Sequence, residues 1–500
     1  SIRERQDYSC ALFDADGNLV VNAPHVPVHL GAMGETVRAL LKAHESDLRP
    51  GEAWVCNDPY QGGSHLPDIT VMQPVFDASG ARLAFVACRG HHVDVGGSTP
   101  GSMPSTARHI DEEGLCLSLQ RISGPTGVVL PDLSQSRQPE DVAADLRAQV
   151  AACRAGADGV TALVEALGAS VIRAWLGHLQ DMAESAVEAE LRARQGVHSA
   201  LERLDDGTEI RVRLSVEGDR ARLDIDAPTH PGNRNAPTAV ARAALLYVFR
   251  CLVEDQLPLN EGALRPFDVR PSPGGLFDPV WPAAVAGGNV ESSQRLVDAL
   301  FVALGALAGS QGTMNNLSVG TPRGAFYETI GGGMGAGPDG PGATAVQCHM
   351  TNTDATDVEE LEARFPVVID AWRRRPGSGG RGRHRGGDGV VKVWRFLAPV
   401  EVSLLVERRN AGAPGLAGGR PGRAGTDVVV RGGERTPASG QVRLMAGDAL
   451  WMQTPGGGGW GPDGSGRSAS RRREDDDSLG AVHSACGEEV PEWQGAGGVA

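Results

Sequence analysis

The sequence predicts a mixed α+β protein with a β-rich N-terminal region, a helical middle segment and an α/β C-terminal region. Short apolar runs near the N-terminus flank turn sequences such as Ala15-Asp16-Gly17-Asn18, which is typical of β-hairpins. From Pro139 to Gln195 the apolar residues follow a helical period, and Pro139-Glu140-Asp141 provides a helix start. Beyond Leu204 strand-like and helix-like stretches alternate, which completes the mixed pattern.

Shifts in composition divide the chain further. Residues 471–477 form a block of arginines followed by acids with no apolar period, so the end of the chain is expected to be disordered. The predicted regions are a β-rich candidate metal-binding region at 1–130, a helical segment at 131–203, an α/β region with Gly- and Asn-rich candidate substrate loops at 204–375, a Gly- and Arg-rich β region at 376–462 and a tail at 463–500.

The charge and residue composition exclude several classes of protein. Lys+Arg 47 against Asp+Glu 62 gives a net charge of −15, which argues against a general nucleic-acid or anionic-membrane binder. The lysines are Lys42 and Lys392, and neither follows a glycine, so a Walker-type phosphate loop is excluded. No apolar run of about 18 residues and no signal sequence occur. We therefore expect a cytoplasmic protein without a membrane span and with mostly buried free thiols.

Histidine and aspartate gather on both arms of one predicted hairpin. If its turn is centred between residues 78 and 79, His65 faces His92 and Asp68 faces Arg89, with His91 one step away. Imidazole and carboxylate are ligands that Zn, Mn and Fe(II) accept. The hairpin therefore predicts a metal site, although polar turn residues and hydrogen-bonded core histidines would give the same pattern.

Further polar residues are candidates for catalysis or substrate binding. His29, with His25 nearby, is a candidate acid or base. Asn289 and Gln294 follow a glycine turn that opens a predicted helix, where free backbone N–H groups hold anions or simply cap the helix. Asn315 lies in a stretch dense in amides and hydroxyls, which suits hydrogen bonding to a small molecule but is also common in turns.

These stretches, taken together, resemble the hydantoinase B/5-oxoprolinase family, in particular the C-terminal half of ATP-dependent 5-oxoprolinases. The resemblance extends over roughly residues 2–461, and its order along the chain makes it more specific than any single motif. The matching stretches are Ala23–Met33, Gly62–Asp68, Arg89–Gly97, Thr99–Pro104, Asp145–Ala152, Gly232–Pro237, Gly287–Asp298, Ser310–Asn316, His349–Thr353, Arg375–Gly389 and Thr454–Trp460.

The resemblance implies a partner and a metal. In this family an actin-like, ATP-binding hydantoinase A-type subunit or fused domain phosphorylates the amide oxygen of the substrate, so ATP is bound by that partner rather than by this chain, and a hetero-oligomer is expected. In the related acetone carboxylases a His-x-x-Asp pair and a later histidine hold a divalent metal. Carried onto this sequence, that set is His65, Asp68 and either His91 or His92.

The resemblance also implies a reaction, which is the ATP-dependent ring opening of a cyclic amide, with 5-oxo-L-proline giving L-glutamate. Asp94 or His29 would act as the general base, and Asn289, Gln294 and Asn315 would bind the substrate. The alternatives are a hydrolase of N-methylhydantoin or hydantoin, a ketone carboxylase subunit, and a non-catalytic scaffold subunit of the complex.

Overall fold

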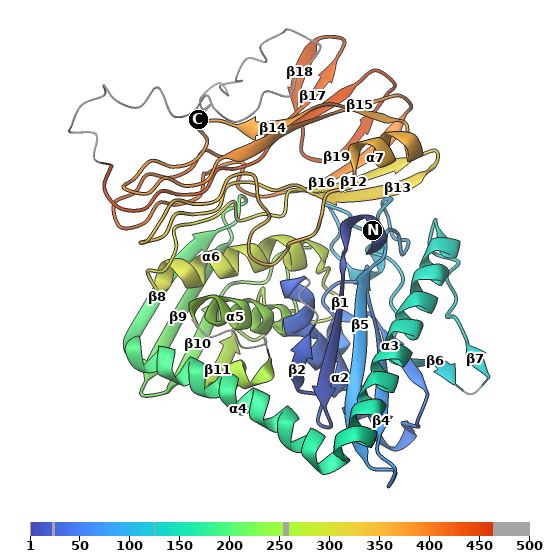
Figure 1. Ribbon diagram of the computed structural model, residues 1–500. Coiled ribbons are helices and arrows are strands. Elements are labelled where there is room, and N and C mark those ends of the chain that lie inside the picture. The colour runs from blue at the N-terminus through green and yellow to red at the C-terminus, as the bar shows by residue number, and fades with distance from the viewer. Residues whose placement is uncertain (1, 23–25, 125, 254–259, 464–500) are drawn as a thin grey trace. The chain divides into compact units, whose positions relative to one another are not determined.

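A seven-stranded antiparallel sheet forms the N-terminal part of the chain in the computed structural model, which describes residues 2–22, 26–124, 126–253 and 260–463 (Figure 1). Its strand order is β2-β1-β5-β4-β3-β6-β7. The strands are β1 (Tyr8–Asp14), β2 (Leu19–Asn22), β3 (Ala53–Cys56), β4 (Asp68–Phe76), β5 (Arg82–His91), β6 (Gln120–Gly124) and β7 (Gly127–Val128).

Helices cover both faces of this sheet because its central strands are apolar on both sides. Val71 of β4 packs with Leu146 of α3 (Pro139–Leu167), whereas the next residue, Met72, packs with Met33 and Val37 of α2 (Pro27–His44). Successive residues of a strand point to opposite faces, so each face acquires its own helix. The sheet is consequently buried on both sides, and its strand ends are positioned by the packing of α2 and α3.

The register of the β4–β5 hairpin differs from the sequence prediction. Asp68 pairs with His91, not with Arg89, and the pairing shifts again at Phe76, which lies opposite Arg82. The predicted turn was too tight. The Asp77 N–H donates a hydrogen bond to the carbonyl of Ala81, four residues later, and the strand register shifts between Val75 and Phe76. The shift of two residues places Asp68 directly opposite a histidine.

A second sheet has the order β11-β10-β9-β8 and packs one face against helices. In β9 the even-numbered positions such as Val212 and Leu214 are buried, whereas Arg211 and Arg213 are exposed. The buried side chains share one core with the helices. The elements are α4 (Ala169–Ala193), β8 (Gly196–Arg203), β9 (Glu209–Glu217), β10 (Arg220–Asp226), α5 (Thr238–Leu252), β11 (Phe267–Pro271) and α6 (Ser293–Ala303).

Two further sheets, with orders β13-β12-β16-β19 and β14-β15-β20-β17-β18, enclose a third core around the fully buried Trp394. These elements are β12 (Asn316–Thr321), β13 (Gly324–Thr329), α7 (Val358–Arg364), β14 (Val367–Arg375), β15 (Gly389–Phe396), β16 (Val400–Leu405), β17 (Thr426–Arg431), β18 (Glu434–Pro437), β19 (Gly440–Leu444) and β20 (Ala449–Gln453). The short helices are α1 (Ile2–Arg5), η1 (Glu45–Asp47), η2 (Pro59–Gln61), η3 (Ile110–Glu112), η4 (Glu261–Leu264) and the π-helical turn η5 (Gly288–Ser292).

The high glycine content is explained by extended segments 331–346, 376–389, 410–425 and 454–461, which we call the glycine layer and which run side by side (Figure 1). The Gly387 N–H donates to Met334 O at 2.8 Å, and the Gly457 N–H donates to Gly387 O at 3.0 Å. A Cβ atom at Gly457 would lie 2.0 Å from Met334 O. Backbones this close leave no room for a side chain, so these positions require glycine.

The mixed α+β fold class is confirmed. Residues up to Asp463 form one compact unit, and the tail predicted at 463–500 lies, apart from Asp463, outside the described residues. Within the described ranges no single helix has the length and apolar character of a membrane span; the bent pair α3 and α4 meets that criterion only jointly, with an angle of 114° between them.

A buried carboxyl group connects the N-terminal region to the turn before η5. Glu113 accepts hydrogen bonds from the backbone N–H groups of Val285 and Ala286 at 2.9 to 3.1 Å, and its side chain is fully buried. Burial raises the pKa of Glu113 to about 8. This contact fixes the start of the segment that carries Asn289.

The glycine layer predicts a large difference between two glycine substitutions. Gly457→Ala forces a methyl group against Met334 O, so we expect the free energy of unfolding to fall by about 3 kcal/mol or more. Gly340→Ala, whose Cβ would meet nothing within 4 Å, is the matched control and should change stability by only about 0.5 kcal/mol. Urea unfolding of both variants measures the difference, and equal losses would contradict the close packing of the layer.

Glu113 predicts a pH-dependent contribution to stability. Because its folded pKa of about 8 exceeds the ordinary value of 4.5, the folded state keeps a proton that the unfolded chain releases. The stabilisation present below pH 4.5 is therefore lost as pH rises toward 8. Relative to Glu113→Gln, the wild-type chain should lose unfolding free energy, on the order of a few kcal/mol, between pH 5 and 8. Urea titrations at several pH values test this, and parallel pH profiles for both proteins would refute it.

Candidate active site around a buried histidine–aspartate cluster

Three side chains predicted as metal ligands converge on one point. His65 Nδ1 lies 3.0 Å from Asp68 Oδ2, and His91 Nδ1 lies 3.2 Å from Asp68 Oδ1. One donor atom from each residue lies within 4.8 Å of the others, and all three side chains are buried. His65 occupies the turn before β4, whereas Asp68 and His91 are paired at the open end of the hairpin. We call these three residues the His–Asp cluster.

His29 is a further imidazole at the cluster. Its Nε2 lies 3.2 Å from Asp68 Oδ1, and its Nδ1 lies 3.4 Å from the hydroxyl of Ser9. The first turn of α2 carries it there because Pro27 opens that helix beside β1. The structure thus places the predicted base in contact with the cluster, whereas its companion His25 lies outside the described residues.

The electrostatics of the cluster favour one ionised carboxylate. Burial opposes the charge of Asp68, but His29 and His65 outweigh it and hold the pKa of Asp68 well below its ordinary value. Burial lowers the pKa of His91, which favours a neutral ring. An ionised carboxylate and a neutral imidazole are the protonation states in which Asp68 and His91 would bind a divalent metal.

The residues present fit a divalent metal ion. One donor atom from each of His65, Asp68 and His91 lies within 4.8 Å of the others, and imidazole and carboxylate are ligands that a divalent ion accepts. In addition, the Nε2 atoms of His65 and His91 are buried and have no hydrogen-bond partner among the described residues. Buried polar atoms are rarely left unsatisfied, and at functional sites they mark places where a ligand or ion is expected. The donor set suits Zn, Mn or Fe.

The structure distinguishes His91 from His92. His92 follows the last residue of β5, and its Nε2 lies 2.9 Å from Gln149 Oε1 of α3. Burial lowers the pKa of His92 to about 4, so the ring is neutral in this environment. Of the two histidines that the resemblance left open, His91 is the one at the cluster.

Asp94, the alternative base, lies in a different environment. Its carboxylate accepts hydrogen bonds from the backbone N–H groups of Gly96 at 2.8 Å and Gly101 at 2.9 Å, and it forms an ion pair with Arg137 at 3.2 Å. Both oxygens therefore hold the loop that follows β5. A role as general base stays a prediction for Asp94, whereas His29 is already in contact with the cluster.

One of the predicted substrate residues reaches the cluster. Asn289 Nδ2 lies 3.1 Å from His65 Nδ1. The turn η5 brings it there, and a Cβ at Gly288 would lie 1.8 Å from Asn235 O, so the approach requires glycine. Gln294 donates to Cys348 O at 3.0 Å, and Asn315 donates to Gln311 Oε1 at 3.0 Å, so these two side chains hold neighbouring loops.

Sequence reasoning missed three residues around the cluster. The buried Arg5 forms an ion pair with Asp7 at 3.2 Å, and Asp7 Oδ1 lies 3.9 Å from His29 Nε2. The Tyr327 ring stacks on His91 with centroids 4.7 Å apart and planes 23° apart, and Arg5 Cζ lies 4.6 Å from the Tyr327 centroid. No local motif marks these residues. For Asp7, the feature that could have indicated its position is the pairing of β1 with β5, which continues from Tyr8 toward Asp7.

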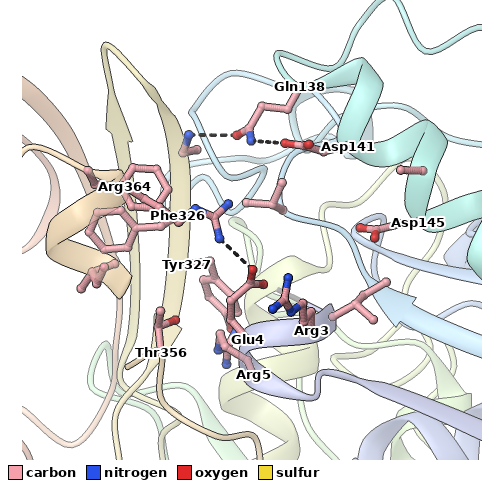
Figure 2. A pocket seen from close by; sticks show the side chains of 16 residues that line it. Arg3, Glu4, Arg5, Gln138, Asp141, Asp145, Phe326, Tyr327, Thr356 and Arg364 are labelled. Atoms are coloured by element: carbon pink, nitrogen blue, oxygen red, sulfur yellow. Dashed lines mark hydrogen bonds and ion pairs between the residues drawn. The ribbon is translucent and has the colours of Figure 1, made fainter. Parts of the chain in front are cut away.

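A pocket of about 240 Å³ lies beside Tyr327 and Arg5 (Figure 2). Its lining carries both signs of charge, including Arg3, Asp145 and the ion pair of Glu4 with Arg364 at 2.7 Å. The pocket shares Tyr327 with the surroundings of the cluster, so it is a polar cavity adjoining the candidate site.

Known proteins resemble this chain over nearly all of its described residues. The "5-oxoprolinase 1" of Arabidopsis thaliana is 43% identical over 92% of this chain, which spans 39% of that relative. The crystal structure of ATP-dependent caprolactamase from Pseudomonas jessenii has a TM-score of 0.82 at 24% identity and covers 92% of this chain and 85% of its own. The nucleotide-free structure of acetone carboxylase has a TM-score of 0.85 at 16% identity, covering 92% of this chain and 72% of its own.

The two solved structures show that the fold is shared. The chain spans about two fifths of the length of the curated relatives that it matches first, 39% and 38%. Residues 1–463 match the family described as Hydantoinase B/oxoprolinase, and the resemblance drawn from the motifs is thereby confirmed. By this match and by its identity to the Arabidopsis relative, the chain belongs to the Hydantoinase B/oxoprolinase family.

Proposed function

We propose that this chain carries the hydrolytic half of an ATP-dependent cyclic amide hydrolase, with the opening of 5-oxo-L-proline to L-glutamate as its reaction. The observation that carries the proposal is the buried His–Asp cluster in a chain whose relatives include 5-oxoprolinases. A hydantoinase A-like subunit or fused domain is the partner, and ATP is bound there. That partner accounts for activation, since an unstrained lactam is a poor electrophile until its carbonyl oxygen is phosphorylated.

The chain's own residues then serve the hydrolytic step. A divalent metal held by His65, Asp68 and His91 would supply Lewis acidity and lower the pKa of water. His29, whose Nε2 lies 3.2 Å from Asp68 Oδ1, is the candidate general base for the attacking water. One water adds to the activated carbonyl carbon, and the bond from that carbon to the ring nitrogen breaks as the nitrogen gains a proton, which leaves an acyl phosphate. A second water then hydrolyses the acyl phosphate to the carboxylate and inorganic phosphate. Asn289 orients His65 through their contact.

Reconstitution tests the reaction. The chain is mixed with its ATP-binding partner, 5-oxoproline, ATP and Mn or Zn, and glutamate and phosphate are measured. Stoichiometric glutamate is expected. Turnover of hydantoins without glutamate would favour a hydantoin hydrolase, and bicarbonate-dependent consumption of a ketone would favour a carboxylase subunit. Full activity of His65→Ala would leave only the scaffold alternative for this chain.

The adjacent histidines provide a matched test of the metal site. His91→Asn removes a cluster ligand, so we expect metal affinity to fall by about tenfold or more, and Asp68→Asn should act in the same direction. His92→Asn alters a histidine that contacts Gln149 instead and should keep wild-type metal content. Elemental analysis after gel filtration and calorimetric titration with Mn or Zn measure both. Equal metal content in the two His→Asn variants would contradict the assignment.

A further inference from the structure

Glu291 is a fully buried carboxyl group that the reaction described above does not use. Its Oε1 accepts hydrogen bonds from Asn316 Nδ2 at 2.7 Å and from the Met314 N–H at 3.2 Å. Its Oε2 is buried without a hydrogen-bond partner among the described residues. The residue lies in η5, the same π-helical turn that presents Asn289 to His65. Such π-turns occur frequently at functional sites.

The contacts of Glu291 lead to Tyr327 through one amide group. Asn316 donates to Glu291 Oε1 and, at 2.6 Å, to Leu405 O, while its Oδ1 accepts the Tyr327 hydroxyl at 2.6 Å. If this amide were rotated by half a turn, its oxygen would face Glu291 Oε1 and Leu405 O, which are both acceptors, and the two hydrogen bonds would be lost. Glu291 and Leu405 therefore fix the orientation in which Asn316 receives the phenol.

Tyr327 in turn limits the position of His91. The tyrosine ring stacks on the imidazole with a centroid separation of 4.7 Å. Arg5 also lies against this ring, and its guanidinium is held by Thr329 at 2.9 Å and Thr353 at 2.8 Å. Tyr327 is thus held at its hydroxyl by the Asn316 amide and at its ring by Arg5, so its plane sets the plane available to His91.

The surroundings of Glu291 favour the neutral acid. Burial and the carboxylate of Glu407 raise the pKa of Glu291 to about 8, although Arg234 and the hydrogen bond from the Met314 N–H oppose them. A neutral acid offers one acceptor oxygen and one hydroxyl, and glutamine reproduces that arrangement without a charge. Glutamine is therefore the conservative replacement at this position.

We propose that Glu291 is a positioning residue that sets the orientation of His91 through Asn316 and Tyr327. The turn η5 then acts on both imidazoles of the His–Asp cluster, on His65 through Asn289 and on His91 through Glu291. The inference rests on the proposed function in one respect, which is that the orientation of His91 matters for metal binding. The link from Glu291 to His91 stands on the contacts themselves.

Chemical modification of the metal-free chain tests the link independently of activity. Diethyl pyrocarbonate reacts with imidazole, and tandem mass spectrometry separates His91 from His92. In Glu291→Ala, His91 should react several-fold faster than in the wild-type chain, and Tyr327→Leu should show the same increase. Glu291→Gln should react at the wild-type rate. An unchanged His91 rate in both Glu291→Ala and Tyr327→Leu would overturn the proposal.

A matched variant separates positioning from general loss of stability. Val319 lies on β12 with Asn316, but its side chain is buried in the core around Trp394. Val319→Ala therefore destabilises the same strand without changing the contacts that link Glu291 to His91. It should leave the His91 reaction rate unchanged, and a rate increased as much as in Glu291→Ala would overturn the proposal.

Titration with Mn(II), followed by electron paramagnetic resonance, tests whether the contacts from Glu291 to His91 affect metal binding. Glu291→Ala should bind Mn(II) about tenfold more weakly than the wild-type chain, and Glu291→Gln should match the wild type. A wild-type chain that binds no Mn(II) or Zn(II) would contradict the proposed function, while the modification rates would still decide the link to His91. A wild-type affinity in Glu291→Ala would contradict the inference and leave the proposed function standing.

Discussion

The ionised Asp68 carboxylate is the charge around which the candidate site is built. A carboxylate with no exposed surface is costly unless its oxygens are paired or hydrogen-bonded. Here His29, His65 and His91 lie within 3.2 Å of it, and Ser64 donates to it at 2.7 Å. These groups come from α2, from the turn before β4 and from β5, so satisfying this one charge fixes the relative positions of those three segments.

The supporting elements show how the chain maintains this arrangement. The N-terminal sheet supplies Asp68 and His91, and α2 supplies His29 because it packs on one face of that sheet. The second half of the chain contributes Asn289 from η5 and Tyr327 from β13. The site therefore depends on contacts between residues more than 200 positions apart, and Asn289 with His65 is one such pair. A rigid environment of this kind suits a centre whose donors must keep their separations.

Two kinds of close packing hold the second half of the chain in place. Backbone contacts in the glycine layer admit no Cβ at positions such as Gly457, which accounts for much of the glycine in the C-terminal region. The buried carboxyl of Glu113 holds the start of the segment that leads into η5. Both features restrict the backbone without forming part of the cluster. The first requires glycine where backbones touch, and the second requires a buried carboxyl group beside the segment that leads into η5.

The sequence by itself determined the fold class, the hairpin that carries the cluster and the set of residue types within it, because alternating apolar residues and turn signals are local properties. The tertiary structure decided the register, which pairs Asp68 with His91, since an irregular turn shifts a strand by amounts that composition does not encode. It also brought in Asp7 and Tyr327, which no motif marks. Their positions depend on how separate sheets pack, and that packing is settled only when the whole core forms.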